Sequence, residues 1–557
     1  MPSKPSRSTG RPGRRDVTAL TYRQPRPPHR QQLESLGGRW LDPGTAAAVS
    51  DVDPEQTAYV GRHLVMASFC EERQVLADLN SIAGTLGWIV TPDPGYDAAR
   101  AKGRDGESDL GISRLTVRVR DGVVASAPDA WRLLQQCRAE LGVDAMFGVG
   151  LDHLMALSPR TTGNPVESSH PVESSHPVES SHPVDVFDPV ESSHPVESSH
   201  PVDSYAVSSY GRPGSGGRQP ITYVGDRPHR HSNVKGRRPV IAILDTGCGQ
   251  HDWLDDVVDK DVTLDGKPIG YTDPKTDPER LGDLVGPLDG GIDPLSGHGT
   301  FIAGLVHQTC PDADIVSWRI VKSSGPLVES DWMHALTKIV ELVRRYYEGD
   351  RGGRPIDVLN LSMGYYHETP QDRLFSPSLR HLLGLLGKCG TTVVCSAGND
   401  ATARPQFPAA FAPWKPARRR SRPRKDRVPV ISVGALNPNL TSIALFSNTG
   451  PWVRAYEPGA SVVSTMPPLQ GGLEPMARTR AFGHEREAID PDNFRRGKDD
   501  TGGFAVWSGT SFAAPVMAGK IARELVGQLP KKRADDSKAA AVARGWKAVA
   551  EVTDIRQ

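Results

Sequence analysis

The sequence lacks long apolar runs. No stretch of the 557 residues approaches the ~20 apolar residues that a helix needs to cross a bilayer, so we expect no membrane span. No apolar segment with a small-residue cleavage site follows the basic N-terminus either. The sequence therefore predicts a cytoplasmic protein without a secretory signal.

Cysteine is scarce, and net charge is absent. The six cysteines form no Cys-x-x-Cys pair and no disulfide framework, which indicates reduced, mostly buried thiols. The 66 basic side chains balance 66 acidic ones, so the net charge predicts no nucleic-acid partner. Basic residues do gather near the N-terminus, where we expect a solvated arm without a packed core.

Composition divides the chain into five zones. The third zone repeats the hexapeptide Pro-Val-Glu-Ser-Ser-His, in which a regularly spaced proline blocks long helices and the polar remainder cannot bury a core. Its evenly spaced histidines could bind a metal, but a floppy chain makes a poor site and the solvated linker is favoured. We predict a disordered basic arm (1–56), a small α+β domain (57–160), a repeat linker (161–236), an α/β domain (237–528) and a C-terminal tail (529–557).

The second zone alternates strand and helix patterns. Helical spacing over Glu71 to Leu86 and over Ala127 to Leu141 is separated by apolar runs that suit strands, and Leu115 to Arg120 alternates as a half-buried strand does. The order strand, helix, strand, strand, helix, strand is compatible with a ferredoxin-like sandwich.

Two segments of the fourth zone place polar side chains where α/β proteins collect their functional groups. Val240 to Leu244 is a continuous apolar run typical of a buried parallel strand, and Asp245 ends it. His298 lies in a Gly-rich turn before the apolar stretch Phe301 to Val306, which predicts a helix. An Asp can orient an imidazole, and His is the natural general base near neutral pH.

Two further segments complete the chemistry. Ser511 begins a predicted helix, so its hydroxyl is exposed on a turn and its N–H points outward. Asn399 follows the apolar strand Val393 to Cys395, and its amide could donate the second hydrogen bond to an oxyanion. The order Asp245, His298, Ser511 is that of subtilisin, which differs from the orders of chymotrypsin and the α/β-hydrolases.

These segments resemble the signatures of the subtilase family of serine peptidases over 237–528. The matching motifs are Asp245-Thr246-Gly247, His298-Gly299-Thr300 with Ala303-Gly304, Gly509-Thr510-Ser511-x-Ala513-x-Pro515, Ser396-Ala397-Gly398-Asn399 and Leu361-Ser362-Met363-Gly364. The resemblance implies a three-layer αβα sandwich around a parallel seven-stranded sheet and hydrolysis of peptide bonds in peptide or protein substrates through an acyl-enzyme. It also implies that Ser362, Met363 and Gly364, with Ser396, Ala397 and Gly398, contact the substrate.

The resemblance has consequences beyond the catalytic residues. Calcium sites are frequent in this family, so a structural calcium ion is allowed, although no cofactor is certain and the sequence places no ligands. Subtilase propeptides typically have a small ferredoxin-like fold, so residues 57–160 are either an inhibitory pro-region or a permanent accessory domain. Two insertions depart from the family pattern: a basic loop, 415–427, and a segment over 469–503.

Two rival interpretations remain open at this point. Asp-Thr-Gly also marks aspartic peptidases, and a second copy begins at Asp500, but it follows a charged run and the helical segments argue against an all-β fold. A degenerate subtilase could serve as a binding scaffold on a repeat stalk. The intact Asp, His, Ser and Asn disfavour this second interpretation.

Overall fold

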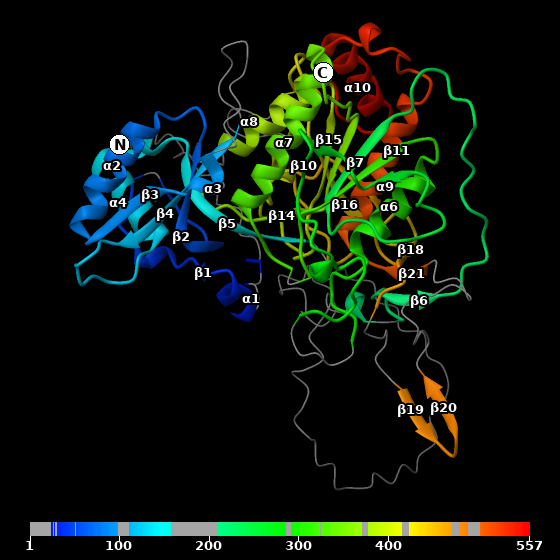
Figure 1. Cartoon of the computed structure of the whole chain (residues 1–557), viewed down its shortest axis with the longest axis horizontal. Coiled ribbons are helices and arrows are strands. Elements are labelled where there is room, and N and C mark those ends of the chain that lie inside the picture. The colour runs from blue at the N-terminus through cyan, green and yellow to red at the C-terminus, as the bar shows by residue number, and fades with distance from the viewer. Residues whose placement is uncertain are drawn as a thin grey trace, which may run out of the picture.

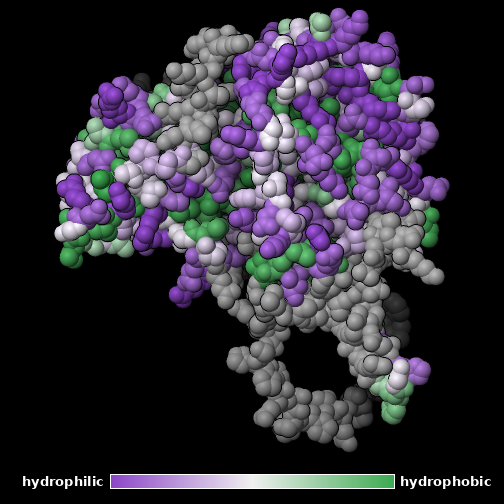
Figure 2. All heavy atoms as spheres, in the orientation of Figure 1, coloured by the Kyte–Doolittle hydropathy of each residue, from purple (hydrophilic) through white to green (hydrophobic). Residues whose placement is uncertain are grey.

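The protein comprises a small domain, residues 30–157, and a large domain, residues 209–557, which lie side by side in Figure 1. The computed structural model describes residues 24–25, 27, 30–50, 52–97, 111–157, 209–212, 214–285, 291–323, 325–369, 377–414, 423–470, 478–487 and 502–557. No helix among these residues is long and apolar enough to cross a membrane. The face seen in Figure 2 is largely hydrophilic, with apolar side chains in scattered patches.

The small domain has the ferredoxin-like fold that the strand and helix order predicts. Its strands are β2 (Ala58–Ala67), β3 (Trp88–Pro92), β4 (Ile112–Val119) and β5 (Val149–Leu157), which pair antiparallel in the order β5-β2-β4-β3. Its main helices are α2 (Glu72–Thr85) and α4 (Ala130–Leu141), with α3 (Pro94–Asp97) as a short turn. Leu64, Leu115 and Leu79 are fully buried in the core between the sheet and these helices.

The large domain is built on a seven-stranded sheet whose strand pairs are all parallel, in the order β17-β16-β15-β13-β7-β11-β8. These strands are β7 (Val240–Asp245), β8 (Val258–Asp259), β11 (Asp314–Arg319), β13 (Val358–Leu361), β15 (Thr392–Ser396), β16 (Ile431–Leu436) and β17 (Ala455–Pro458). The helices are α6 (His298–Thr309), α7 (Glu329–Glu348), α8 (Pro377–Lys388), α9 (Thr510–Leu525) and α10 (Lys538–Val552).

Alternation along β7 shows how helices cover both faces of this sheet. Ile241 and Ile243 belong to one core cluster, which contains residues of α6, α9 and α10. Val240, Ala242 and Leu244 belong to the other, which contains residues of α7 and α8. Because successive side chains of a strand point to opposite faces, a strand covered on both sides must be apolar throughout. The predicted αβα sandwich is confirmed.

Smaller strands lie at the margins of the large domain. A three-stranded sheet joins β18 (Val462–Met466), β21 (Gly503–Trp507) and β6 (Gln219–Ile221). The hairpins are β9 (Thr263–Leu264) with β10 (Lys267–Pro268), and β19 (Arg478–Ala481) with β20 (His484–Glu487) within the predicted insertion over 469–503. Two short strands, β12 (Leu327–Val328) and β14 (Met363–Gly364), pair with β5 of the small domain, and Figure 1 shows β5 extending toward the large domain.

Three predicted boundaries differ from the structure. The end of the predicted arm forms α1 (Arg30–Ser35) and β1 (Gly38–Trp40), and β1 pairs with β2. The end of the predicted linker contains β6, which pairs with β21, so the large domain begins before residue 237. The predicted tail contains α10, because Val542, Trp546 and Val549 recur at helical spacing and are buried in the large domain's core. Residues 1–23 of the arm, 161–208 of the linker and 415–422 of the basic loop lie outside the described residues.

Candidate active site

Asp245 and His298 meet at the carboxyl end of the parallel sheet. Asp245 is the last residue of β7, His298 is the first of α6, and both side chains are fully buried. The Asp245 Oδ1 atom lies 2.6 Å from His298 Nδ1. The backbone N–H of Thr246 also donates to Oδ1, at 2.8 Å, so the carboxylate is held in place. A proton on Nδ1 then leaves the Nε2 lone pair available to act as a base.

Ser511 lies in the first turn of α9, beside the imidazole. The ring of Phe512, the next residue, is 5.2 Å from the His298 ring between centroids. In the structure the Ser511 hydroxyl donates to the carbonyl oxygen of Ser362 at 3.3 Å, and His298 Nε2 is buried without a hydrogen bond among the described residues. Phe512 thus brings the start of α9 next to His298, and no hydrogen bond joins the Ser511 and His298 side chains in the structure.

Asn399 is oriented by the residue that precedes Ser511. The backbone N–H and the hydroxyl of Thr510 both lie 2.9 Å from the Asn399 Oδ1 atom. Since a backbone N–H can only donate, the atom that faces it must be the amide oxygen. The amide Nδ2 consequently points elsewhere, buried and without a hydrogen-bond partner among the described residues. A buried amide donor beside Ser511 is what an oxyanion requires.

Each of the two predicted substrate segments is hydrogen-bonded to the start of α9. The Ser362 carbonyl oxygen accepts the Ser511 hydroxyl, and the Ser362 hydroxyl donates to the Ser511 carbonyl oxygen at 2.9 Å. Gly398 donates its N–H to the Thr510 hydroxyl at 3.0 Å, and its φ of +102° places the backbone where a Cβ would lie 1.9 Å from the Gln406 side chain. A side chain at this position would strain the backbone and would have to displace the Gln406 side chain. Ser396, Ala397, Met363 and Gly364 complete the two segments as buried residues.

The sequence profile of the Subtilase family matches residues 236–543, which is more than half of the chain. The chain belongs to the subtilase family. The family and the α/β fold together exclude the aspartic-peptidase alternative. Of the second Asp-Thr-Gly motif, on which that alternative depended, only Gly502 lies among the described residues.

Curated relatives of this subtilase are bacterial serine proteases. It is 24% identical over 250 residues to the major intracellular serine protease of Bacillus subtilis (strain 168), which covers 42% of this chain and 62% of that protein. It is 25% identical over 305 residues to the intracellular serine protease of Paenibacillus polymyxa, covering 52% of this chain and 68% of that protein. The chain thus spans less than two thirds of the first relative's length.

Solved structures of subtilisin-like enzymes are also similar. Fervidolysin from Fervidobacterium pennivorans, a keratinolytic enzyme related to subtilisin, aligns with a TM-score of 0.41 at 15% identity, covering 86% of this chain and 59% of that chain. A lanthipeptide protease aligns with a TM-score of 0.34 at 20% identity, covering 55% of this chain and 78% of that chain.

Sequence reasoning missed Glu279, a buried carboxylate behind the subtilase's Asp245–His298 pair. Its Oε1 accepts hydrogen bonds from the Thr246 hydroxyl and, at 2.9 Å, from the Gly299 N–H. Its Oε2 accepts from the Thr300 hydroxyl and, at 3.2 Å, from the Thr300 N–H. Burial raises the pKa of Glu279 to about 7, although these hydrogen bonds oppose the shift.

Glu279 therefore acts as a cap supplied from outside the helix. The residue that precedes α6 is Gly297, which has no side chain to cap the first N–H groups. Glu279 takes that place and ties the helix that begins with His298 to the turn that follows Asp245. No motif marks it in the sequence, because it lies in an irregular loop after β10 and its partners are distant in the chain.

Sequence reasoning predicted the last strand of the small domain but missed that it pairs with Met363 and Gly364, part of one predicted substrate segment. Within the pairing of β5 with β14, Met363 is opposite Leu157 and Gly364 is opposite Ala156, antiparallel. Within its pairing with β12, Leu327 is opposite Met155 and Val328 is opposite Leu154. The end of the small domain thus forms a strand between β12 and β14 of the large domain.

One group of side chains among the described residues could hold a metal ion, namely His153, His367 and Glu368. It lies apart from Asp245 and His298, and it contains the wrong atoms for calcium, which prefers oxygen ligands. A structural calcium ion stays a prediction.

Proposed function

We propose that this subtilase is a serine endopeptidase that hydrolyses peptide bonds with Asp245, His298 and Ser511. The observation that carries the proposal is the buried Asp245–His298 hydrogen bond of 2.6 Å, which leaves Nε2 open beside the first turn of α9. The Ser511 hydroxyl gives its proton to Nε2 as Oγ attacks the substrate carbonyl carbon. Asn399 Nδ2 and the Ser511 N–H hold the oxyanion that forms.

The second half of the reaction follows from the same groups. His298 returns the proton to the amine as the C–N bond breaks, which leaves an acyl-enzyme on Ser511. Water, activated by His298, then hydrolyses the ester. Asp245 holds the imidazole in the tautomer that both steps need.

Labelling with a fluorophosphonate probe tests this function, because the probe reacts with an activated serine. The Ser511→Ala variant should be compared with the unaltered chain under conditions in which both are folded. Labelling that Ser511→Ala abolishes supports an assembled nucleophile. A folded chain that never labels, with or without its small domain, favours the binding-scaffold interpretation.

We further propose that the small domain inhibits this active site in cis. The support is that β5 pairs with both β12 and β14, so an extended substrate and β5 would compete for the same backbone groups. A chain that begins at residue 209 keeps β6 with β21 and should label faster than the full chain. Equal labelling rates would instead favour a permanent accessory domain.

A cytoplasmic site of action is also proposed. Two relatives are named intracellular serine proteases. All six cysteines of this chain lie among the described residues and none forms a disulfide, as expected in a reducing compartment. Localisation of a tagged chain by cell fractionation tests this proposal, and recovery from the culture medium would contradict it.

A further inference from the structure

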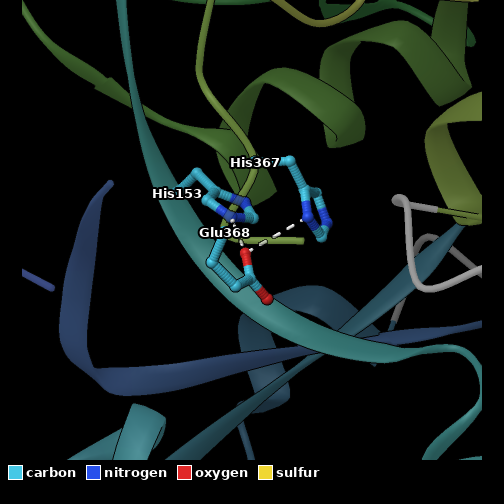
Figure 3. Close-up of side chains that lie close together, drawn as sticks. All are labelled: His153, His367 and Glu368. Atoms are coloured by element: carbon cyan, nitrogen blue, oxygen red, sulfur yellow. Dashed lines mark hydrogen bonds and ion pairs between the residues drawn. The ribbon is translucent and has the colours of Figure 1, made fainter. Parts of the chain in front are cut away.

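A buried cation joins the two domains where β5 approaches the large domain. His153 lies on β5, and Figure 3 shows its ring beside the carboxylate of Glu368. The His153 Nδ1 atom lies 2.6 Å from Glu329 Oε2, and Nε2 lies 2.7 Å from Glu368 Oε2. At most 2% of each of these three side chains is exposed.

The geometry requires a protonated imidazole. A neutral ring carries one N–H, whereas both ring nitrogens of His153 face carboxylate oxygens, which only accept when ionised. Burial by itself lowers the pKa of His153, but the charges and hydrogen bonds of Glu329 and Glu368 outweigh it and raise the pKa to about 10. The two carboxylates that flank the ring thus favour His153 as a cation.

The two carboxylates belong to the large domain. Glu329 begins α7, and the Tyr365 hydroxyl donates to its Oε1 at 2.8 Å. The Tyr365 ring stacks on the imidazole with centroids 4.5 Å apart and planes at 23°. Glu368 is fully buried, and its backbone carbonyl accepts the N–H of Glu55 at 2.7 Å. We call Glu329, Glu368 and the Tyr365 ring the acidic socket.

A docked strand with a neutral side chain at position 153 would leave Glu329 and Glu368 buried without the cation that contacts both, which is strongly unfavourable. The position of the cation along the incoming strand is also fixed. His153 lies four residues before Leu157, the residue opposite Met363, and Leu154 and Met155 pair with β12 between them. Charge and strand register must therefore be satisfied together.

We propose that the acidic socket selects the segment that lies along β12 and β14, by requiring a cationic side chain four residues before the one opposite Met363. The subtilase's own small domain meets this requirement with His153. The inference rests on the proposed function, in that these strands are taken as the substrate strands. It extends recognition beyond the residues next to Ser511.

A metal ion is the alternative occupant of this region. One ligand atom from each of His153, His367 and Glu368 lies within 4.8 Å of the others. However, the Nδ1 atom of His367 already accepts the Thr369 N–H at 3.1 Å and lies 3.3 Å from Glu368 Oε2. The two carboxylates that flank one imidazole favour the cation.

Hydrogen–deuterium exchange of the β5 amides measures docking without any need for activity. We would use the full chain with Ser511→Ala, so that nothing is cleaved, and add His153→Gln, His153→Lys or, as a matched control in the same domain, His63→Gln. His63 lies outside the socket and is 3.4 Å from Asp152. The β2–β4 amides report whether the small domain stays folded.

His153→Gln should raise exchange at residues 154–157 on the order of 10²- to 10³-fold, because it leaves buried carboxylates unpaired. His153→Lys keeps the charge and should exchange at least about 10-fold more slowly than His153→Gln. Adding Glu368→Gln to His153→Gln should restore part of the protection, because a buried carboxylate is neutralised. A small domain that was merely destabilised would not respond in this way.

Equal exchange in His153→Gln and His63→Gln would overturn the inference. One equivalent of a transition metal bound to the purified chain, and lost in His367→Gln, would overturn it in favour of a metal site. Failure of fluorophosphonate labelling would instead remove the proposed catalytic function and leave the exchange results standing, so the two failures can be told apart.

Discussion

Removal of the Glu279 carboxylate should impair both the stability of the large domain and the reactivity of Ser511. Glu279 is 3% exposed and accepts the N–H groups of Gly299 and Thr300 at 2.9 and 3.2 Å. In Glu279→Ala both donors lose their acceptor at a buried helix start. A lost cap costs about 1 kcal/mol, and a buried unsatisfied donor costs about 1–3 kcal/mol.

Part of that cost is offset, because the substitution also removes the unfavourable burial of a carboxylate. We therefore expect a net destabilisation of about 2–4 kcal/mol, which corresponds to a fall in Tm of roughly 3–5 °C for a domain of this size. His298 directly precedes Gly299, so its ring should shift with the frayed helix start. A displacement near 1 Å can cost about 10²-fold in rate, and we expect Ser511 labelling to slow by about 10- to 100-fold.

Thermal unfolding and the rate of fluorophosphonate labelling test these values on the same preparations. Glu279→Gln keeps one acceptor oxygen and should lie between Glu279→Ala and the unaltered chain. Arg280→Ala, at the exposed neighbouring position, is the matched control and should change neither quantity. If Glu279→Ala matched the control in both Tm and labelling rate, the proposed capping of α6 from outside the helix would be wrong.

Three further outcomes follow from the site and its surroundings. Asn399→Ala removes an oxyanion donor and should lower kcat by about 10²- to 10³-fold with a smaller change in KM, measured with a peptide substrate once one is found. Gly304→Ala places a Cβ 2.2 Å from Thr465 Oγ1, so overpacking between α6 and β18 should cost about 1–3 kcal/mol in urea unfolding, and an unchanged midpoint would contradict this. Burial raises the pKa of Glu279 from 4.5 to about 7, so the folded state holds this proton more tightly than the unfolded chain does. This contribution to the free energy of unfolding is complete below about pH 4.5 and is lost as the pH rises through about 7. It amounts to at most about 3 kcal/mol and should be missing from the pH profile of the stability of Glu279→Gln.

The sequence predicts features that depend on local pattern. The apolar run Val240 to Leu244 identifies a strand covered on both faces, and Asp245 then lies at the edge where functional groups collect. The helix starts at His298 and Ser511 are recognisable in the same way, because glycine and small residues precede an apolar stretch. The fold class of both domains follows from such patterns.

Features that depend on distant pairing could not be predicted. Glu279 is one acidic residue in a loop of polar residues, and only the folded chain brings Thr246 and Thr300 to it. β6 contributes three residues in a proline-containing segment, too short to show a strand period. The pairing of β5 with both β12 and β14 could not be predicted either, because a strand pattern in the sequence does not show which strand it pairs with.

Under the proposed inhibition in cis, the pairing of β5 with both β12 and β14 would set a threshold concentration for any outside peptide. As long as the chain is intact, β5 is covalently joined to the domain whose strands it pairs with, so its effective concentration there does not depend on dilution. A free peptide must exceed that value, weighted by its relative affinity, before it displaces β5. The connection between the domains therefore sets the peptide concentration that is needed to displace β5. Lengthening the connection should lower this concentration gradually, and cutting it should make the concentration depend on dilution.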